Sequence, residues 1–244
     1  METMLNINGF MTKVSYSEKE IQTLFYPILN ELIKRRKEKN GRLIVYLAAP
    51  PGTGKTTLSL FLKKLFDQLE TPYSFQALSI DGFHYDRDYL TSHYITRNGT
   101  EILLNNVKGS PESFNLEALT DTLKDLRDKP VNWPIYDRII HDVSEETITA
   151  DADIVLIEGN WLLLNEEKWN ELEDYCDISL FIEADQEVLK QRLINRKIRG
   201  GLSPEEAEIF YRESDGKNVE RVLRNHFNTD IVLKLTSKEE LVKG

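Results

Sequence analysis

Cysteine is almost absent from this sequence. Cys176 is the single cysteine among 244 residues, so no disulfide can form within the chain. A fold without disulfides suits a reducing compartment, and we expect a cytoplasmic protein. The chain also lacks an apolar run long enough to span a membrane, and its first ten residues carry neither the basic flank nor the apolar core of a secretory signal. We therefore expect no membrane partner.

Basic residues are outnumbered. The chain has 31 Lys and Arg against 41 Asp and Glu, which gives a net charge of −10. An extended nucleic-acid surface requires a basic stripe, so we expect no nucleic-acid partner. Any anion site must be a local basic pocket in an acidic body. No cluster of His and Cys has the spacing of zinc ligands, which makes a zinc site improbable.

The chain does contain a glycine-rich segment between a predicted strand and a predicted helix. Residues 49–57 read Ala-Pro-Pro-Gly-Thr-Gly-Lys-Thr-Thr, after an apolar run that predicts a buried strand and before a predicted helix over 56–69. This resembles the phosphate-binding loop G-x-x-x-x-G-K-[ST], with Ala49 where the pattern has glycine. A chance glycine turn is the alternative, but the strand before it and the helix after it favour a phosphate loop.

The loop residues have separate physical roles. Glycines let backbone N–H groups turn inward toward phosphate oxygens, and the helix N-terminus adds a positive dipole end. Lys55 would reach the β- and γ-phosphates, and the hydroxyl of Thr56 would help to hold Mg²⁺. We therefore predict ATP and Mg²⁺ as cofactors. The expected nucleotide-binding residues are Pro51, Gly52, Thr53, Gly54, Lys55, Thr56 and Thr57.

Strand and helix patterns alternate along the chain. This predicts an α/β fold of the P-loop nucleoside triphosphate hydrolase type, with three layers and a mostly parallel sheet covered by helices on both faces. We expect one domain over 1–244, with an N-terminal helix at 17–40, a substrate-side insertion at 84–114 and a lid at 186–202. The main strands are expected at 43–48, 73–80, 154–157, 178–182 and 231–235, with shorter ones at 131–136 and 146–150.

Two carboxylates follow predicted strands. Ligands bind at the carboxyl ends of parallel strands, and both Asp81 and Glu158 lie there. If the strand before Asp81 neighbours the phosphate-loop strand, Asp81 can accept a proton from an attacking hydroxyl. A turn aspartate is the alternative, because Asp-Gly is also a turn signal. Glu158 can orient Mg²⁺ directly or through water, or it can be a solvated acid at a strand end.

Three arginines share one face of the predicted helix 186–199. Arg192, Arg196 and Arg199 are spaced i, i+4, i+7, and the repulsion between like charges suggests an anionic partner. With Gly200 and Gly201 as a hinge, we interpret this helix as a lid over the phosphates. A solvated basic face is the alternative.

Residues after Pro134 are candidates for a substrate pocket. Tyr136, Arg138 and His141 combine hydrogen-bonding and charged groups near the expected cleft, as does His84. Each of them taken singly could equally be a surface or structural residue.

Five landmarks in order resemble the phosphoribulokinase/uridine kinase family, and its pantothenate-kinase-like branch most of all. They are the loop at 50–57, Ile-Asp-Gly-Phe-His at 80–84, Gly-Ser-Pro-Glu-Ser-Phe at 109–114, Pro-Ile-Tyr-Asp-Arg at 134–138 through Asp142, and Ile-Glu-Gly-Asn-Trp at 157–161 followed by Arg192, Arg196 and Arg199. The resemblance runs from about residue 43 to residue 235.

The resemblance implies an ATP-dependent kinase that phosphorylates a hydroxyl of a small metabolite. It implies Asp81 as catalytic base, Lys55 and Thr56 on ATP and Mg²⁺, and Glu158 as the metal-side acid. It places Tyr136 and Arg138 on the substrate side, and Arg192 and Arg196 in the lid. Uridine kinases carry an arginine two residues after the histidine that His141 matches, and here Val143 stands there.

The expected acceptor is a sugar, a nucleoside, or a pantothenate- or glycerate-like compound. A P-loop NTPase that hydrolyses its nucleotide without a substrate, or a non-catalytic nucleotide-binding regulator, are the alternatives. A homodimer is left open.

Overall fold

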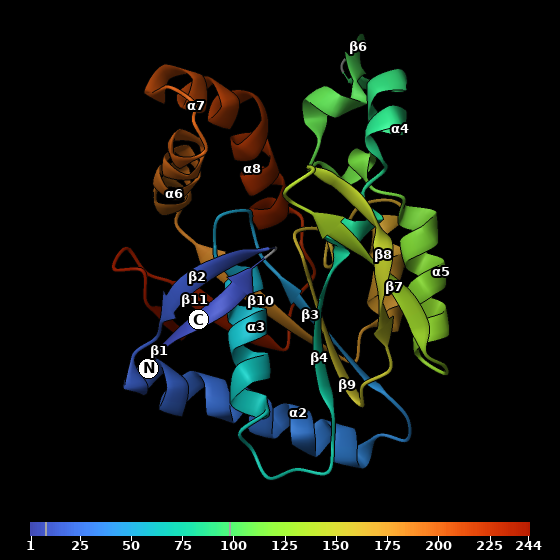
Figure 1. Ribbon diagram of the computed structural model, residues 1–244, viewed down its shortest axis with the longest axis vertical. Coiled ribbons are helices and arrows are strands. Elements are labelled where there is room, and N and C mark those ends of the chain that lie inside the picture. Colours follow the sequence, from blue (N-terminus) through green and yellow to red (C-terminus); the bar gives the residue numbers. More distant parts are fainter. Residues whose placement is uncertain (8, 98) are drawn as a thin grey trace.

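The protein, described here from a computed structural model for residues 1–7, 9–97 and 99–244, is built around one six-stranded sheet (Figure 1). The strand order is β12 (Leu241–Lys243), β11 (Ile231–Leu235), β10 (Ile178–Ala184), β3 (Leu43–Ala48), β9 (Ile154–Gly159) and β4 (Phe75–Ser79). All neighbours pair in parallel except β11 and β12. The predicted α/β fold with a mostly parallel sheet is confirmed.

The central strand β3 is buried on both faces. Its residues Leu43, Val45 and Leu47 belong to one core, and Ile44 and Tyr46 belong to the other. Successive side chains of a strand point to opposite faces, so helices must cover both sides of the sheet. The three-layer arrangement follows directly from this continuous apolar run.

Helices supply the outer layers. The first core is covered by α2 (Tyr26–Glu38), α3 (Lys55–Phe66) and α6 (Gln186–Arg199), and the second by α5 (Leu116–Leu126) and the 3₁₀ segment η5 (Trp169–Tyr175). In Figure 1, α6, α7 (Pro204–Phe210) and α8 (Gly216–Arg224) rise above one side of the sheet, with the π-helical segment η6 (Tyr211–Asp215) between the last two. No helix of the described residues is long and apolar enough to cross a membrane.

The N-terminal helical segment begins with the expected capping box, in which Ser17 and Glu20 cap each other. The segment comprises α1 (Glu18–Glu20), the π-helical turn η1 (Ile21–Phe25) and α2. Pro27 lies in the first turn of α2. Proline has no N–H to donate to the preceding turn, which accounts for the irregular backbone hydrogen bonds where η1 meets α2.

The order of the strands corrects one expectation. The strand before Asp81, β4, does not neighbour β3, because β9 lies between them and pairs with both. The register places Glu158 beside Leu47 of β3 and beside Ser79 of β4. Glu158 therefore stands between the phosphate loop and Asp81.

The short strands predicted after α5 form a separate antiparallel hairpin. It comprises β7 (Val131–Asp137) and β8 (Asp142–Ala150), with an irregularity between Pro134 and Tyr136. The predicted insertion contains α4 (Arg87–Ser92), the hairpin strands β5 (Tyr94–Arg97) and β6 (Thr100–Leu103), and the 3₁₀ segments η3 (Leu104–Val107) and η4 (Pro111–Ser113). In Figure 1, α4 and β6 rise opposite α6 and α7.

An N-terminal hairpin was not predicted. Strands β1 (Glu2–Ile7) and β2 (Phe10–Ser15) pair with each other, and Leu5 and Val14 join the first core. An Asn-Gly pair at 8–9 between runs containing apolar residues is a typical sequence signal for such a hairpin. Gly9 lies close to the turn of the β7–β8 hairpin, because a Cβ atom at Gly9 would stand 3.6 Å from the side chain of Ile139.

Gly82 allows no side chain. It lies in the 3₁₀ segment η2 (Ile80–Phe83), and a Cβ there would stand 2.0 Å from the carbonyl oxygen of Pro134. Both partners are backbone, so neither can move aside cheaply. The hairpin β7–β8 therefore packs directly against the segment that carries Asp81.

We expect Gly82→Ala to lower the free energy of unfolding by about 3 kcal/mol or more, because the methyl group would overpack a rigid contact. Gly41→Ala is the control: its φ is +96° and no atom lies within 4 Å of the Cβ position. In the control, the free energy of unfolding should fall by about 1–2 kcal/mol, because alanine is strained in the left-handed backbone conformation of Gly41. Urea unfolding would measure both, and equal losses would contradict the packing argument.

Candidate active site

The phosphate loop has the geometry that its sequence predicts. Gly52 and Gly54 adopt left-handed φ values of 87° and 92°, which only glycine adopts without strain. Helix α3 begins at Lys55, directly after Gly54. Ala49 is fully buried and is not among the described residues with positive φ, so alanine is accommodated where the pattern has glycine.

Thr56 and Lys55 both face Glu158. The Thr56 hydroxyl donates a hydrogen bond to Oε1 of Glu158 at 2.8 Å, and the Lys55 ammonium lies 4.0 Å from Oε2. Burial raises the pKa of Glu158, against the opposing charge of Lys55. Burial likewise lowers the pKa of Lys55, against the charges of Glu158 and Asp81. The two buried charges stabilise each other.

These oxygens suit a hard cation. Hydroxyl and carboxylate oxygens are ligands that Mg²⁺ prefers, and Mg²⁺ typically keeps several waters beside one or two carboxylates. Thr56 and Glu158 are hydrogen-bonded to each other, and both line a cavity of about 160 Å³ together with Asp81. The residues present therefore fit a magnesium ion held partly through water.

Asp81 is held in the ionised form. Burial alone would raise the pKa of its carboxyl, but the charge that His84 carries at acid pH, together with the charges of Arg138 and Lys55, outweighs burial and leaves the pKa of Asp81 below its ordinary value. A terminal nitrogen of Arg138 donates a hydrogen bond to Oδ2 of Asp81 at 3.0 Å. The carboxylate keeps 30% of its side-chain surface exposed, so a second molecule can reach it.

The predicted substrate-side residues meet around Asp81, with one exception. His84 Nδ1 lies 2.8 Å from the carbonyl oxygen of Asp81, and its ring lies 5.6 Å from that of Tyr136. Burial lowers the pKa of His84, against the charge of Asp81, so the ring is neutral near pH 7. His141 is exposed at the turn of the β7–β8 hairpin, with a φ of 56°, so its place in the site stays a prediction.

The arginine-bearing helix α6 rests on the phosphate loop. The Arg192 guanidinium lies 3.7 Å from the Cβ position of Gly54, and Leu193 lies 3.0 Å from that of Gly52. Arg196 lies 3.8 Å from Asp215. Burial lowers the pKa of Arg196, although the charge of Asp215 opposes this effect. Of the two predicted lid arginines, Arg192 thus lies against the loop, whereas Arg196 faces Asp215 at the end of η6.

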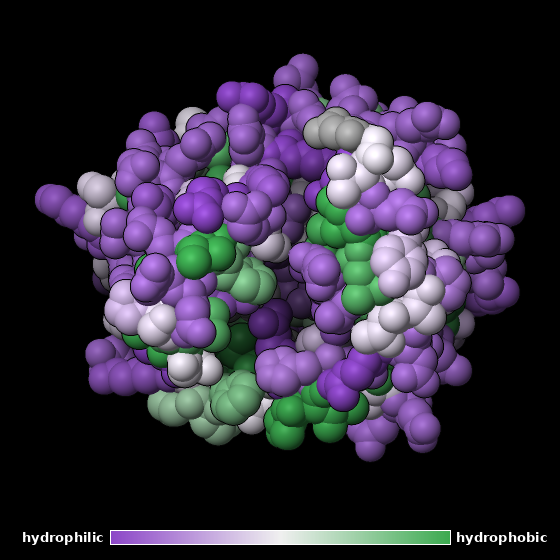
Figure 2. Space-filling view, turned by 90° about the horizontal axis from the view of Figure 1, so that it is seen from above, coloured by the Kyte–Doolittle hydropathy of each residue, from purple (hydrophilic) through white to green (hydrophobic). Residues whose placement is uncertain are grey.

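A cleft opens at the carboxyl edge of the sheet. Figure 2 looks onto this edge from above and shows a hollow near the middle of the face, bordered by both hydrophilic and hydrophobic residues. Above the sheet, α6 and α7 rise on one side of the molecule and α4 and β6 on the other (Figure 1). The phosphate loop, Asp81 and Glu158 all belong to this edge.

Sequence reasoning missed two charged residues of this region. Asp215, 9% exposed, faces Arg196, and Lys108 lies with its ammonium 4.9 Å from the centre of the Tyr136 ring. Neither belongs to a motif with fixed spacing. Only the fold of the insertion and of the helices after α6 brings them to the site.

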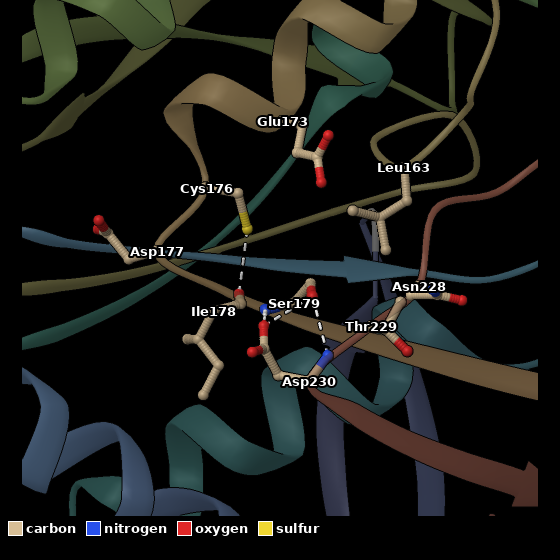
Figure 3. Close-up of a pocket in the computed structure, with 9 residues that line it drawn as sticks. All are labelled: Leu163, Glu173, Cys176, Asp177, Ile178, Ser179, Asn228, Thr229 and Asp230. Atoms are coloured by element: carbon tan, nitrogen blue, oxygen red, sulfur yellow. Dashed lines mark hydrogen bonds between the residues drawn. The ribbon is translucent and has the colours of Figure 1, made fainter.

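A larger cavity, of about 320 Å³, lies elsewhere (Figure 3). It lies beside the starts of β10 and β11 and is lined by residues such as Cys176, Ser179 and Asp230. The Ser179 backbone and hydroxyl both donate to Asp230 at 2.8 Å, and the Cys176 thiol donates to the Ile178 carbonyl. Burial raises the pKa of Cys176 to about 12, so the thiol is unreactive. These contacts are structural.

Most of the chain matches one known family of proteins. The family model described as "Phosphoribulokinase / Uridine kinase family" matches residues 44–239. The chain belongs to the phosphoribulokinase/uridine kinase family. The family resemblance seen in the sequence is thereby confirmed, and the β1–β2 hairpin lies outside the matched residues.

Relatives within the family extend over most of the chain. The chain is 39% identical to the uncharacterized protein YggC of Escherichia coli, over 98% of this chain and 97% of that protein. It is 25% identical to a pantothenate kinase of Vibrio cholerae, over 84% of this chain and 70% of that enzyme. It is 32% identical to a uridine kinase of Staphylococcus epidermidis, over 66% of this chain and 72% of that enzyme.

Solved structures of the family share the fold. A Silicibacter kinase assigned provisionally to a fructose transport system superposes with a TM-score of 0.73 at 26% identity, over 84% of this chain and 97% of that one. The phosphoribulokinase of Rhodobacter sphaeroides gives a TM-score of 0.51 at 12% identity, over 80% of this chain and 70% of that enzyme. The second likeness concerns the fold alone.

The pair formed by Arg138 and Asp81 yields a test. The folded-state pKa of Asp81 lies below its ordinary value, so the pair stabilises the fold at neutral pH, and this stabilisation is lost as the pH falls through the folded-state pKa. We expect Arg138→Gln to raise the pKa of Asp81, as measured by NMR titration of the aspartate carboxyl carbons.

Arg87→Gln is the control, because Arg87 binds the same hairpin through the Ile140 carbonyl. An unchanged Asp81 pKa in Arg138→Gln would show that Arg138 does not hold Asp81 ionised.

Proposed function

We propose that the protein is an ATP-dependent kinase that transfers the γ-phosphate to a hydroxyl of a small metabolite. The acceptor would be a sugar, a nucleoside, or a pantothenate- or glycerate-like compound. One observation carries this proposal: Asp81, an ionised and partly exposed carboxylate, lies in one cavity with Thr56 of the phosphate loop and with Glu158. A general base beside a phosphate loop suits transfer to an alcohol.

Asp81 would act as the general base. The acceptor hydroxyl would hydrogen-bond to the Asp81 carboxylate and give up its proton there as its oxygen attacks the γ-phosphorus in line. Arg138 keeps the carboxylate ionised and oriented through the bond at 3.0 Å. The neutral ring of His84 and the hydroxyl of Tyr136 would contact the acceptor.

The phosphate groups would be held from two sides. The loop residues 51–57, with Lys55 among them, would bind the phosphates on one side. Arg192 and Arg196 would approach the phosphates from α6 on the other side. The contact of α6 with Gly52 and Gly54 supports this role. Thr56 and Glu158 would hold Mg²⁺, which neutralises phosphate charge when bound.

The segment 186–202 would serve as a lid within a single kinase domain over 1–244. Gly201, with a φ of +105° and open space around its Cβ position, is suited to a hinge after α6. Closure would exclude water, which would otherwise consume ATP without an acceptor. The segment 84–114 would form the wall of the acceptor side.

The proposal predicts a turnover defect without a binding defect in Asp81→Asn. The amide cannot accept the proton, so turnover should fall by roughly 10²–10⁴-fold while ATP still binds. The measurement is Mg²⁺-dependent ADP release across a panel of nucleosides, pantothenate, glycerate, pentoses and hexoses. Near-normal turnover in the variant would remove Asp81 from the mechanism.

The same assay separates the alternatives. ADP release that depends on no acceptor would indicate a P-loop NTPase, and ATP binding without turnover on any acceptor would indicate a non-catalytic regulator.

Lys55→Ala tests the phosphate loop. Loss of a charge-assisted hydrogen bond costs about 1.5–3 kcal/mol, so ATP affinity should fall roughly tenfold or more by calorimetry. Lys63→Ala is the matched control on the same helix, where Lys63 pairs with Asp67 one turn away. Unchanged ATP affinity in Lys55→Ala would count against the loop as the nucleotide site.

A further inference from the structure

The N-terminal hairpin β1–β2 borders the cavity that contains Asp81. Asn6 of β1 lines this cavity together with Thr56, Asp81 and Glu158. The hairpin lies outside residues 44–239, which the family model matches. The family model therefore gives no role to Asn6, and the role must be argued from its surroundings.

The base of the hairpin is fixed on the body of the protein. Leu5 of β1 and Val14 of β2 are buried in the first core. In Figure 1 the hairpin crosses α3, and the Lys64 ammonium of α3 donates a hydrogen bond to the Thr3 hydroxyl. These contacts hold Asn6 beside the helix that follows the phosphate loop.

A hydrogen bond within the hairpin orients the side chain of Asn6. The Gly9 N–H donates to Oδ1 of Asn6 at 2.9 Å. The Nδ2 group of the same carboxamide takes no part in this bond and carries two hydrogens that it can donate. Because Asn6 is exposed and lines the cavity, this group is accessible to a small molecule bound there.

Most of the other residues that line the cavity are apolar. Leu60 comes from α3, Ala77 and Leu78 come from β4, and Ile148 comes from β8. Apolar walls offer no hydrogen bonds, so the few polar groups of such a site fix the orientation of the molecule that binds.

Two serines of the lining are already engaged within the protein. The Ser59 hydroxyl donates to the Thr56 carbonyl at 2.9 Å, and the Ser79 hydroxyl accepts from the Asp81 N–H at 3.2 Å. The Nδ2 group of Asn6 therefore supplies a donor that these serines do not.

The nucleotide phosphates do not account for this donor. Leu193 and Arg192 of α6 lie against Gly52 and Gly54 of the phosphate loop. Among the described residues, neither these glycines nor α6 line the cavity, whose walls come instead from α3, β4 and the two hairpins. A donor at Asn6 is thus placed for the acceptor and not for the phosphates.

We infer that Asn6 determines acceptor specificity, and that its Nδ2 group donates a hydrogen bond to an oxygen of the acceptor other than the one that is phosphorylated. The inference rests on the kinase function proposed above and adds a residue to its acceptor site. It favours acceptors with a second oxygen function, such as polyols, hydroxy acids and hydroxy amides, and sets simple monoalcohols aside.

Two variants at this position separate binding from folding. Asn6→Ala removes the donor and also the oxygen that accepts from the Gly9 N–H, whereas Asn6→Asp removes the donor and keeps such an oxygen. The assay uses the intact chain, Mg²⁺–ATP and the compound of the panel above that most stimulates ADP release. Both variants should raise KM for that compound roughly three- to tenfold and leave KM for ATP unchanged.

The pair of variants isolates the donor. Asn6→Ala adds no charge and Asn6→Asp preserves the turn, so an effect common to both comes from the lost donor. Asn132→Asp is the matched control, because Asn132 is exposed on β7 and, within the described part of the chain, does not line the cavity. It should leave both KM values unchanged.

An introduced thiol gives a second readout. Cys176 is the only cysteine of the sequence, and burial raises its pKa to about 12, so it does not compete for N-ethylmaleimide. In Asn6→Cys, a saturating concentration of the same compound should slow modification severalfold. Met11→Cys is the control, because Met11 pairs with Asn6 across the hairpin and its modification should not be slowed.

The outcomes separate the two proposals. An unchanged KM for the acceptor in Asn6→Asp, with a raised KM in Asn6→Ala, would make Asn6 a turn residue and overturn this inference while the kinase stands. Equal rises in KM for ATP and for the acceptor would overturn it as well. ADP release that no compound of the panel stimulates in the unaltered chain would count against the kinase proposal and against this inference together.

Discussion

Glu158 accepts a hydrogen bond from Thr56 and lies beside Lys55, and this buried contact joins the start of α3 to the end of β9, which are distant in sequence. The register of β9 against β3 and β4 sets its position. A buried carboxylate left without partners would be costly, so the contact with Thr56 and Lys55 stabilises the loop. The side chains that meet at the carboxyl edge, from the phosphate loop to Asp81, are arranged around it.

Backbone packing also fixes the β7–β8 hairpin against the segment that carries Asp81. At Gly82 a backbone oxygen of the β7–β8 hairpin occupies the space of a side chain, so Asp81 and Arg138 keep a fixed separation. Preorganised charges of this kind favour transfer chemistry, because little reorganisation is needed when a reaction begins. The residues beneath the cleft are thus held by close backbone packing.

The sequence predicted what local spacing determines. Short segments with clear strand and turn signals predicted the phosphate loop and the mostly parallel sheet. They also predicted that Asp81 and Glu158 lie at the carboxyl ends of strands. The position of β9 between β3 and β4 did not, because pairing such as Leu47 with Glu158 joins residues far apart in the chain. Lys108 was missed for the same reason: its contacts depend on how the insertion folds onto the hairpin.

Arg221 in α8 connects parts of the molecule that border opposite sides of the cleft. It donates to Glu112 of the insertion at 2.9 Å and to Glu166, which follows β9, and Glu112 also binds Arg97. One guanidinium thus ties α8 to the insertion at 84–114. Loosening of α8 on heating should therefore also loosen the insertion, and the two regions should exchange their amide hydrogens as one cooperative unit.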